Sequence, residues 1–169
     1  PLGSKNIWIR KVDAATGNEI WTKTVNGYAN TGDKGRGIAV DVLKNRLYTT
    51  GYIGHPSNSD SRVLDADTWV QKRDLDGNEK WTMWIGNSGM DEGNGIAVDS
   101  GGNSYVVGYK SVNNNRDIHI FRIDNTDSYP VKIRWSRTYD DPYHGEDIAS
   151  DVAIDPSTNG LYIVATGYQ

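Results

Sequence analysis

Short apolar stretches alternate with glycine- and asparagine-rich turns along the whole chain, and one stretch occurs three times. Gly37–Asp41 and Gly95–Asp99 both read Gly-Ile-Ala-Val-Asp, and Asp151–Asp155 reads Asp-Val-Ala-Ile-Asp. A turn and a second short strand with a tyrosine follow each copy; these tyrosines are Tyr48, Tyr105 and Tyr162. The final aspartates of the three copies are 58 and 56 residues apart, a spacing that predicts a propeller or another repeat array.

Two further strand-like runs belong to each repeat. The first lies at Ile7–Ile9, Thr68–Val70 and Ile118–Ile120. The second opens on a tryptophan each time, namely Trp21, Trp81 and Trp135. Between these two runs, Asp76-Gly77-Asn78 is a strong hairpin signal, because these residues tolerate the positive φ of tight turns. Four short strands joined by turns describe one blade of a β-propeller, so the predicted fold is all-β with four antiparallel strands in each blade.

The order of strands within a blade follows from the small residue at the centre of the Ile-Ala-Val-Asp strand, which is Ala39, Ala97 or Ala153. Small side chains suit the innermost strand, here strand a, because blades crowd around the propeller axis. The chain then begins with strands c and d, continues through two abcd blades and ends with a and b. The approximate repeats are 5–52, 67–109 and 117–168, within a single domain at 5–169. Residues 1–4 resemble the remnant of a cleaved expression tag, and the natural amino terminus is expected to be missing.

Three blade equivalents cannot close a ring, because propellers typically have four to eight blades. An open arc would expose sheet edges and an apolar blade face, which favours association. The phase therefore predicts a homodimer in which the c–d pair of one chain completes the a–b pair of the other, twice, in a six-bladed ring. The alternative is that the arc is a piece of a longer natural protein.

Composition excludes several functional classes. The net charge of −4 argues against nucleic acid, whose binding requires clustered Lys and Arg. Because cysteine is absent, there are no disulfides, cysteine nucleophiles or thiolate metal sites. No apolar run approaches the roughly 20 residues that a membrane-spanning helix needs.

The repeat resembles the bacterial and archaeal β-propeller repeat called SBBP, with nearly the whole chain covered. The second unit carries the pattern almost complete, in Trp69, Lys72, Asp74, Gly77, Asn78, Glu79, Trp81, Asp91, Gly93, Gly95, Asp99, Asn103, Tyr105 and Gly108. The third unit departs from it, with His119 in place of tryptophan, Asp151 in place of glycine and a longer c–d turn. The resemblance implies a secreted or surface protein that acts as a binding or scaffold module.

Repeated acidic residues are the first candidates for chemistry. Asp33, Asp91 and Asp147 stand eight residues before the strand-ending aspartates of their units. They could form a ring of carboxylates for a metal, but the favoured interpretation is that each caps loop amides, because short polar side chains do so in turns. The run that begins at Asp74 and Asp76 echoes a calcium loop but lacks the distal glutamate ligand, so a hairpin is favoured there.

The remaining motifs also favour structural roles. Asp13-x-x-Thr16-Gly17-x-x-x-Trp21 resembles the tryptophan-docking motif of quinone-dependent dehydrogenases, where it locks blades together, so it supports a propeller without supporting the enzyme. The histidines show no metal-ligand spacing, and no catalytic triad or carboxylate pair can be recognised. We therefore predict no catalytic residues, no metal and no cofactor.

Long, dissimilar loops give the clearest prediction of a binding surface. The d–a loops (27–32, 86–90 and 140–146) and the b–c loops (53–66 and 110–116) are expected on one side of the propeller, which we call the long-loop rim. Function often resides in variable loops on a rigid scaffold, although long loops can also be tolerated insertions. The candidate ligand-binding residues on this rim are Tyr28, Asn30, His55, Asn58, Arg62, Asn113, Asn114, Asn115, Arg116, Tyr143 and His144.

The sequence thus predicts a non-enzymatic, extracellular or cell-surface module that binds a protein or glycan on the long-loop rim. The rival interpretation is a fragment of a propeller enzyme, either a quinoprotein or a carbohydrate-active enzyme. Several non-repeating carboxylates in a central channel would favour the enzyme, and a channel lined only by repeat residues would favour the module. A third interpretation is that the repeats are recent copies without a ligand.

Overall fold

Twelve β-strands and no helix make up the described residues of the computed structural model, which are 5–27, 31–56, 64–86, 88–113 and 115–167. The strands are β1 (Ile7–Val12), β2 (Glu19–Val25), β3 (Asp33–Asp41), β4 (Arg46–Pro56), β5 (Leu64–Arg73), β6 (Glu79–Ile85), β7 (Glu92–Val98), β8 (Ser104–Val112), β9 (Asn115–Ile123), β10 (Ile133–Tyr139), β11 (Ile148–Ile154) and β12 (Leu161–Thr166). Because no helix is present there, no described segment could span a membrane as an apolar helix.

These strands form two complete blades and two half-blades, all with antiparallel pairing. Blade 1 has the order β3-β4-β5-β6, and blade 2 has the order β7-β8-β9-β10. The N-terminal half-blade is β1-β2 and the C-terminal half-blade is β11-β12. The predicted phase of c–d, abcd, abcd and a–b is therefore confirmed. The described residues form no closed ring.

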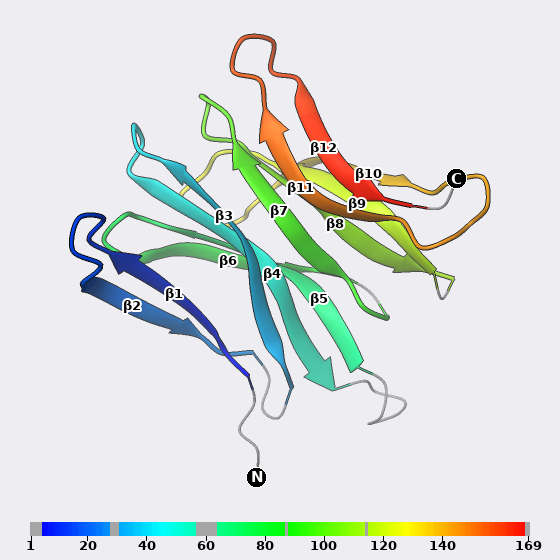
Figure 1. Ribbon diagram of the computed structural model, residues 1–169, viewed down its shortest axis with the longest axis horizontal. Helices are drawn as coiled ribbons and strands as arrows, with labels where there is room; N and C mark the ends of the chain where they lie inside the picture. The colour runs from blue at the N-terminus through cyan, green and yellow to red at the C-terminus, as the bar shows by residue number, and fades with distance from the viewer. Residues whose placement is uncertain (1–4, 28–30, 57–63, 87, 114, 168–169) are drawn as a thin grey trace.

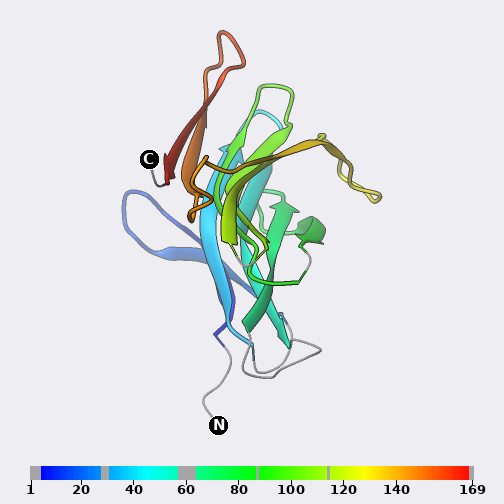
Figure 2. The ribbon, with the colours of Figure 1, turned by 90° about the vertical axis from the view of Figure 1, so that its right-hand side faces the viewer.

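The sheets stack into an open arc. The innermost strands β3, β7 and β11 lie side by side, and the half-blades lie at opposite ends of the molecule (Figure 1). The view turned by 90° shows the sheets one behind another, with the outer strands of blade 2 reaching away from the inner ones (Figure 2).

A β-bulge interrupts the innermost strand at the same point in all three units. The pairing shifts between Gly35 and Gly37 in β3, between Gly93 and Gly95 in β7, and between Ala149 and Asp151 in β11. The residues that the bulge leaves unpaired are Arg36, Asn94 and Ser150. A bulge bends the strand and redirects its side chains, so these three residues occupy equivalent special positions.

The bulge also corrects the alignment of the third repeat. In sequence, Gly167-Tyr168 looks equivalent to Gly51-Tyr52, but the register shows that this is wrong. Ala165 pairs with Ala149 just as Gly51 pairs with Gly35. The equivalent of Gly51 in the third unit is therefore an alanine, two residues earlier than the Gly-Tyr dipeptide suggests.

The core consists of three clusters, each between two neighbouring blades. The N-terminal half-blade and blade 1 share Ile7, Ile9, Leu47, Ile53 and Trp69. Blades 1 and 2 share Tyr48, Val70, Trp81, Ile96, Val106, Phe121 and Ile123. Blade 2 and the C-terminal half-blade share Val107, Ile120, Ala149 and Val152. Each blade is therefore stabilised by the neighbour that covers its face, as in other repeat proteins.

The b–c connections are shorter than expected. The pairing of β8 with β9 continues to Val112 and Asn115, so the predicted long loop at 110–116 is wrong. A tight hairpin turn replaces it, with Asn113 at a φ of 50°. In blade 1 the strands pair out to Pro56 and Leu64, and the intervening tip lies outside the described residues.

Candidate functional site

The d–a and b–c connections meet on one side of the arc, as the sequence predicts. Thr31 Oγ1 donates to the carbonyl of Gly54 at 2.6 Å in blade 1. In the other units the amide of Asp91 donates to the carbonyl of Ala66 at 2.8 Å, and that of Asp147 donates to the carbonyl of Arg116 at 2.6 Å. The long-loop rim is therefore a real surface, on which each d–a segment is hydrogen-bonded to a b–c hairpin.

Not all of the predicted site residues can be placed on this rim. Those outside the described residues are Tyr28, Asn30, Asn58, Arg62 and Asn114. His55 lies at the end of blade 1, with Nε2 3.7 Å from Asp65 Oδ1. At the other end of the rim, Asn115 donates to the carbonyls of His144 and Gly145, at 2.9 and 2.5 Å.

Three of the predicted residues thus meet at the blade 2 end of the rim. They are Asn115, Arg116 and His144, and Tyr143 is next to them in the same exposed loop. Asn113 occupies the hairpin turn. The structure therefore divides the predicted set into separate places instead of assembling one site.

A polar hollow of about 630 Å³ opens where the innermost strands begin, at their long-loop ends. We call it the central hollow. Residues of six strands and one loop line it: Lys34, Arg36, Tyr52, Met90, Glu92, Asn94, Tyr109, Arg116, Ile148 and Ser150. Its volume falls in the range of small-molecule sites. Arg116 is the one lining residue that sequence reasoning selected.

A series of contacts between charged and aromatic side chains runs across this hollow. The guanidinium of Arg36 is bonded to the carboxylate of Glu92, which is buried, and Tyr109 donates its hydroxyl proton to Glu92 Oε2 at 3.1 Å. The guanidinium of Arg116 lies 4.9 Å from the ring centroid of Tyr109. Burial, together with the Glu92 carboxylate, raises the pKa of Tyr109, so its hydroxyl stays protonated and available as a donor.

The other lining residues escaped sequence reasoning because they come from different repeats and share no motif. One signal was available, however. At the position of Lys34 the other two repeats have Glu92 and Ile148, and at the position of Arg36 they have Asn94 and Ser150. Positions that differ between otherwise similar repeats mark the central hollow.

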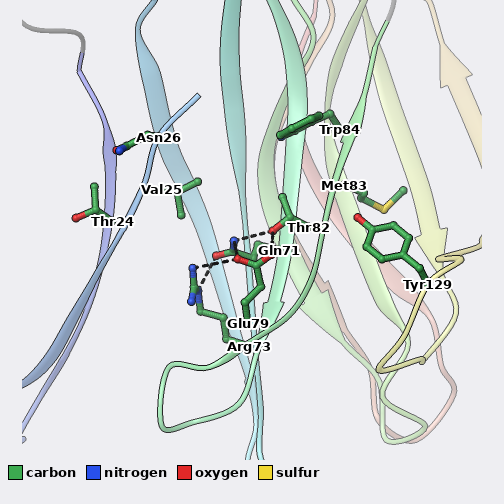
Figure 3. A pocket seen from close by; sticks show the side chains of 10 residues that line it. All are labelled: Thr24, Val25, Asn26, Gln71, Arg73, Glu79, Thr82, Met83, Trp84 and Tyr129. Carbon is green, nitrogen blue, oxygen red and sulfur yellow. Dashed lines mark hydrogen bonds and ion pairs between the residues drawn. The ribbon is translucent and has the colours of Figure 1, made fainter. Parts of the chain in front are cut away.

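A second hollow, of about 650 Å³, lies on the outer side between β2 and the strands β5 and β6. Figure 3 shows the side chains of Arg73, Gln71, Glu79 and Thr82 gathered on blade 1, with Thr24 and Val25 across from them. Arg73 Nε donates to Gln71 Oε1, and Gln71 Nε2 donates to Thr82 Oγ1, both at 2.7 Å.

This outer network replaces apolar core positions of blade 2. Gln71 and Arg73 are buried, and their equivalents are the buried Phe121 and Ile123. Their polar groups hydrogen-bond to one another, as buried polar groups require. The hydrogen bonds within the network are sufficient to explain why these polar residues are buried. We therefore assign no ligand to it.

The repeated aspartates have the structural role that the sequence favours. Asp33 accepts the amides of Gly27 and Gly54 at 2.7 and 3.2 Å. Asp91 accepts the amide of Ser111 at 2.7 Å, and Asp147 that of Asp141 at 2.8 Å. Each one ties its d–a segment or the neighbouring hairpin to the start of the innermost strand.

One acidic group could geometrically hold a cation. The ligand atoms of Asp140, Asp141 and Asp147 lie within 4.8 Å of one another. Their oxygens already form the loop, because Asp141 Oδ1 accepts the amide of Tyr143 at 2.8 Å and Asp140 Oδ2 lies 2.5 Å from Nδ1 of His144. Each of the three carboxylates has an oxygen engaged in a bond within this loop, although the buried Asp141 Oδ2 accepts none from the described residues, and we propose no metal there.

The calcium-like segment is a hairpin, as expected. Asp74 Oδ1 accepts the amides of Asp76 and Asn78 at 3.1 and 2.8 Å, and Gly77 has a φ of 86°. Although burial opposes it, hydrogen bonds from Asn78 and the nearby Lys80 lower the pKa of Asp74 to about 2. The carboxylate therefore organises its own turn.

Tryptophan docking between blades is also confirmed. Trp21 Nε1 donates to the carbonyl of Leu75 at 3.2 Å, from the N-terminal half-blade to blade 1. Trp81 Nε1 donates to the carbonyl of Thr126 at 2.9 Å, from blade 1 to blade 2. These two hydrogen bonds link consecutive blades.

Comparison with protein families gives one match. Residues 80–113 match the family model of the SBBP beta-propeller repeat. This segment is therefore similar to an SBBP repeat. The matched segment begins in the last strand of blade 1 and ends after the a–b hairpin of blade 2. The SBBP pattern therefore crosses from one blade into the next, as does the core. Comparison with curated protein sequences found no match.

Proposed function

We propose that this protein is a non-enzymatic binding and scaffold module whose propeller is completed by a second copy of the same chain. One comparison carries the proposal. Ile38, Ile96 and Val152 occupy the same position in β3, β7 and β11, yet Ile38 is 61% exposed, whereas the other two are 6% and 7% exposed. The position is buried wherever an a–b pair of the preceding blade is present.

The missing cover at Ile38 leaves a defined groove. Ile96 packs beside Tyr48, which belongs to the a–b pair of blade 1. The N-terminal half-blade has no such pair, and a hollow of about 190 Å³ lies between β1 and β3, with Ile9, Ile38 and Trp69 among its lining residues. Another a–b pair would fill this place as β3 and β4 do in front of blade 2.

The C-terminal half-blade, at the other end of the arc, is an a–b pair with an uncovered face. Tyr162 and Val164 of β12 are 65% and 67% exposed, although their equivalents are among the most buried residues. Those equivalents are Tyr48 at 1%, Tyr105 at 9%, and Thr50 and Val107 at 0%. Large apolar side chains on the free face of β12 therefore match the uncovered Ile38 and Val40 of a second copy.

In the proposed dimer, β12 of one copy would pair with β1 of the other, and we call this contact the seam. The repeat predicts the register of this pairing. In blade 1, Tyr48 of β4 pairs with Lys72 of β5, and in blade 2 Tyr105 of β8 pairs with Arg122 of β9. The cation lies over the ring in both pairs, at 5.3 Å for Lys72 and 5.9 Å for Arg122. By equivalence, Tyr162 of one copy stands opposite Lys11 of the other, which restores the third tyrosine–cation pair.

Two such seams close the assembly. The free edges of β12 and β1 gain backbone hydrogen bonds, and a two-fold axis makes the seams identical. Two sets of three blade equivalents give six blades, within the range of known propellers. The central hollow supports the module over the enzyme, because Glu92 is the one carboxylate among its lining residues and is already bound to Arg36 and Tyr109.

Engineered cysteines test the seam directly, because the protein has none of its own. Thr49 pairs with Gln71 in blade 1, and their equivalents are Ile163 and Arg10. We expect the double variant Arg10→Cys/Ile163→Cys to form a covalent dimer under mild oxidation, because directly opposite residues have Cβ atoms close to disulfide distance.

A matched control shifts the register by two residues. Arg10→Cys/Leu161→Cys places the second thiol on the same face but in a diagonal position, roughly 7–8 Å away, so we expect much slower crosslinking. Non-reducing electrophoresis of the two variants at equal concentration measures the rates. Equal rates, or no covalent dimer in either variant, would contradict the proposed seam.

A further inference from the structure

The central hollow is positively charged, although the protein is acidic. Lys34, Arg36 and Arg116 line it against the single carboxylate of Glu92, whereas the whole chain carries a net charge of −4. Lys34 is exposed and forms no ion pair within the described residues. A local excess of positive charge in a concave site attracts anions, because the protein walls limit screening by solvent.

The guanidinium of Arg36 is held in place by the buried carboxylate of Glu92. Its Nε is bonded to Glu92, which is buried and also accepts the hydroxyl of Tyr109. Within the described residues no other group binds its two terminal nitrogens. A fixed guanidinium fork matches the paired oxygens of a carboxylate or phosphate and loses little entropy when it binds one.

The second arginine approaches from the rim. Arg116 lies over the ring of Tyr109, and its guanidinium also forms an exposed ion pair with Glu146, at 3.6 Å. Exposed ion pairs contribute little and exchange readily, so this guanidinium can turn toward a ligand. Two neutral polar residues, Asn94 and Ser150, line the hollow from β7 and β11, and Asn94 Nδ2 also donates to the carbonyl of Ala149 at 2.8 Å.

From this geometry we propose that the central hollow binds an oxyanion group, a carboxylate or a phosphate, of a small polar ligand. Arg36 is the fixed recognition residue, and Lys34 and Arg116 add charge at its edge. The bulge places Arg36, Asn94 and Ser150 at equivalent positions, so one structural device presents three different side chains to one ligand.

Calorimetric titration with defined anions tests this site. The probes are citrate and inorganic phosphate at low ionic strength, with sucrose as the neutral control. We expect saturable binding of at least one anion, none of sucrose, and weaker binding as salt is added. Binding of citrate alone identifies carboxylate as the preferred group, and binding of phosphate alone identifies phosphate.

Charge variants locate the binding. Lys34→Gln and Arg116→Gln should each weaken the affinity about fivefold, because one charge roughly 4 Å away in water has that effect. Lys132→Gln makes the same charge change in the exposed c–d turn of blade 2, outside the hollow, and should leave the affinity unchanged. No saturable binding, or an equal loss in all three variants, would overturn the assignment.

The site does not depend on ring closure, because one copy supplies every lining residue. A dimer-breaking variant, Tyr162→Asp on β12, should therefore retain the anion affinity. Retained binding in a monomer would separate the two proposals. A loss of binding together with the loss of the dimer would contradict a site built by one chain.

Discussion

The two complete blades and the two half-blades are built from the same repeat, but equivalent side chains have very different surroundings in them. Ile96 is covered by the a–b strands of blade 1, whereas Ile38 faces the groove beside β1. Tyr48 is enclosed between blades 1 and 2, whereas its equivalent Tyr162 is exposed. Burial in this fold is therefore supplied by the neighbouring blade and not by the strand that carries the residue.

The largest effects are expected when a charge is placed at the two equivalent isoleucines. Ile96→Asp should lower the free energy of unfolding by more than about 4 kcal/mol, because it leaves an unpaired charge in a core. Ile38→Asp should keep the fold but weaken dimerisation at least about 100-fold, because the same charge would enter the seam. Urea unfolding and analytical ultracentrifugation measure the two effects.

Leu43→Asp is the matched control for both. Leu43 is 95% exposed in the turn after β3 and belongs neither to a core cluster nor to the groove beside β1. We expect it to change neither unfolding nor association. A dimer that persists in Ile38→Asp would show that this face is not the seam.

A cationic residue occurs at the same position of strand c in every unit, and its surroundings differ between complete blades and half-blades. Lys72 is buried, and its Nζ donates at 2.8 Å to Asn125 Oδ1, to the carbonyl of Thr126 and to Asp127 Oδ1. Burial lowers the pKa of Lys72, while Asp127 opposes this effect. Its equivalent Lys11 is partly exposed and, within the described part of the chain, donates one hydrogen bond, to the carbonyl of Leu75 at 3.1 Å.

Alanine at these two positions should therefore have unequal effects. Lys72→Ala should cost about 2–4 kcal/mol of unfolding free energy, because it removes several buried, charge-assisted hydrogen bonds. Lys11→Ala should cost about 1 kcal/mol in a monomeric background such as Ile38→Asp. Equal losses in chemical denaturation would contradict the difference between complete and incomplete blades.

A third comparison uses pH, because His119 stands where the other units have Trp8 and Trp69. Burial lowers the pKa of His119 to about 4, and its Nε2 lies 2.7 Å from Ser136 Oγ. The unfolded chain therefore takes up a proton at higher pH than the folded chain. Stability from this residue is complete above about pH 6.5 and is lost as the pH falls toward 4.

His119→Phe should remove this acid-side loss, which amounts to at most about 3 kcal/mol. Denaturation curves at pH 4.5 and 7 measure the difference between the two proteins. His144→Asn is the control, because His144 is exposed and a hydrogen bond with Asp140 raises its pKa, which gives a pH dependence of opposite sign. A wild-type protein and a His119→Phe variant with parallel pH profiles would contradict this assignment.

Most of the fold could be predicted from the repeat. Alanine at the centre of one strand identified the innermost strand, and the phase of the half-blades followed from it. The turn at Asp76-Gly77 was predicted from local residue preferences alone. The bulges and the register of Ala165 could not be predicted, because they depend on backbone pairing, and the Gly-Tyr dipeptide gave a false alignment.

Less of the candidate site could be predicted. Arg116 was found because it lies on the long-loop rim, and it does line the central hollow. Lys34, Arg36 and Glu92 were missed, because two strands from different repeats, β3 and β7, bring them together and each is an ordinary polar residue in its own repeat. Once the strands are aligned, the difference between repeats at these positions is the signal that identifies them.

The central claim is that a second copy supplies the cover that the half-blades lack. Light scattering after size exclusion measures the mass in solution and tests this most directly. We expect a mass of twice the 18.7 kDa of one chain, about 37 kDa, and a return to the mass of one chain in Ile38→Asp. A wild-type mass of one chain at the same concentration would contradict it.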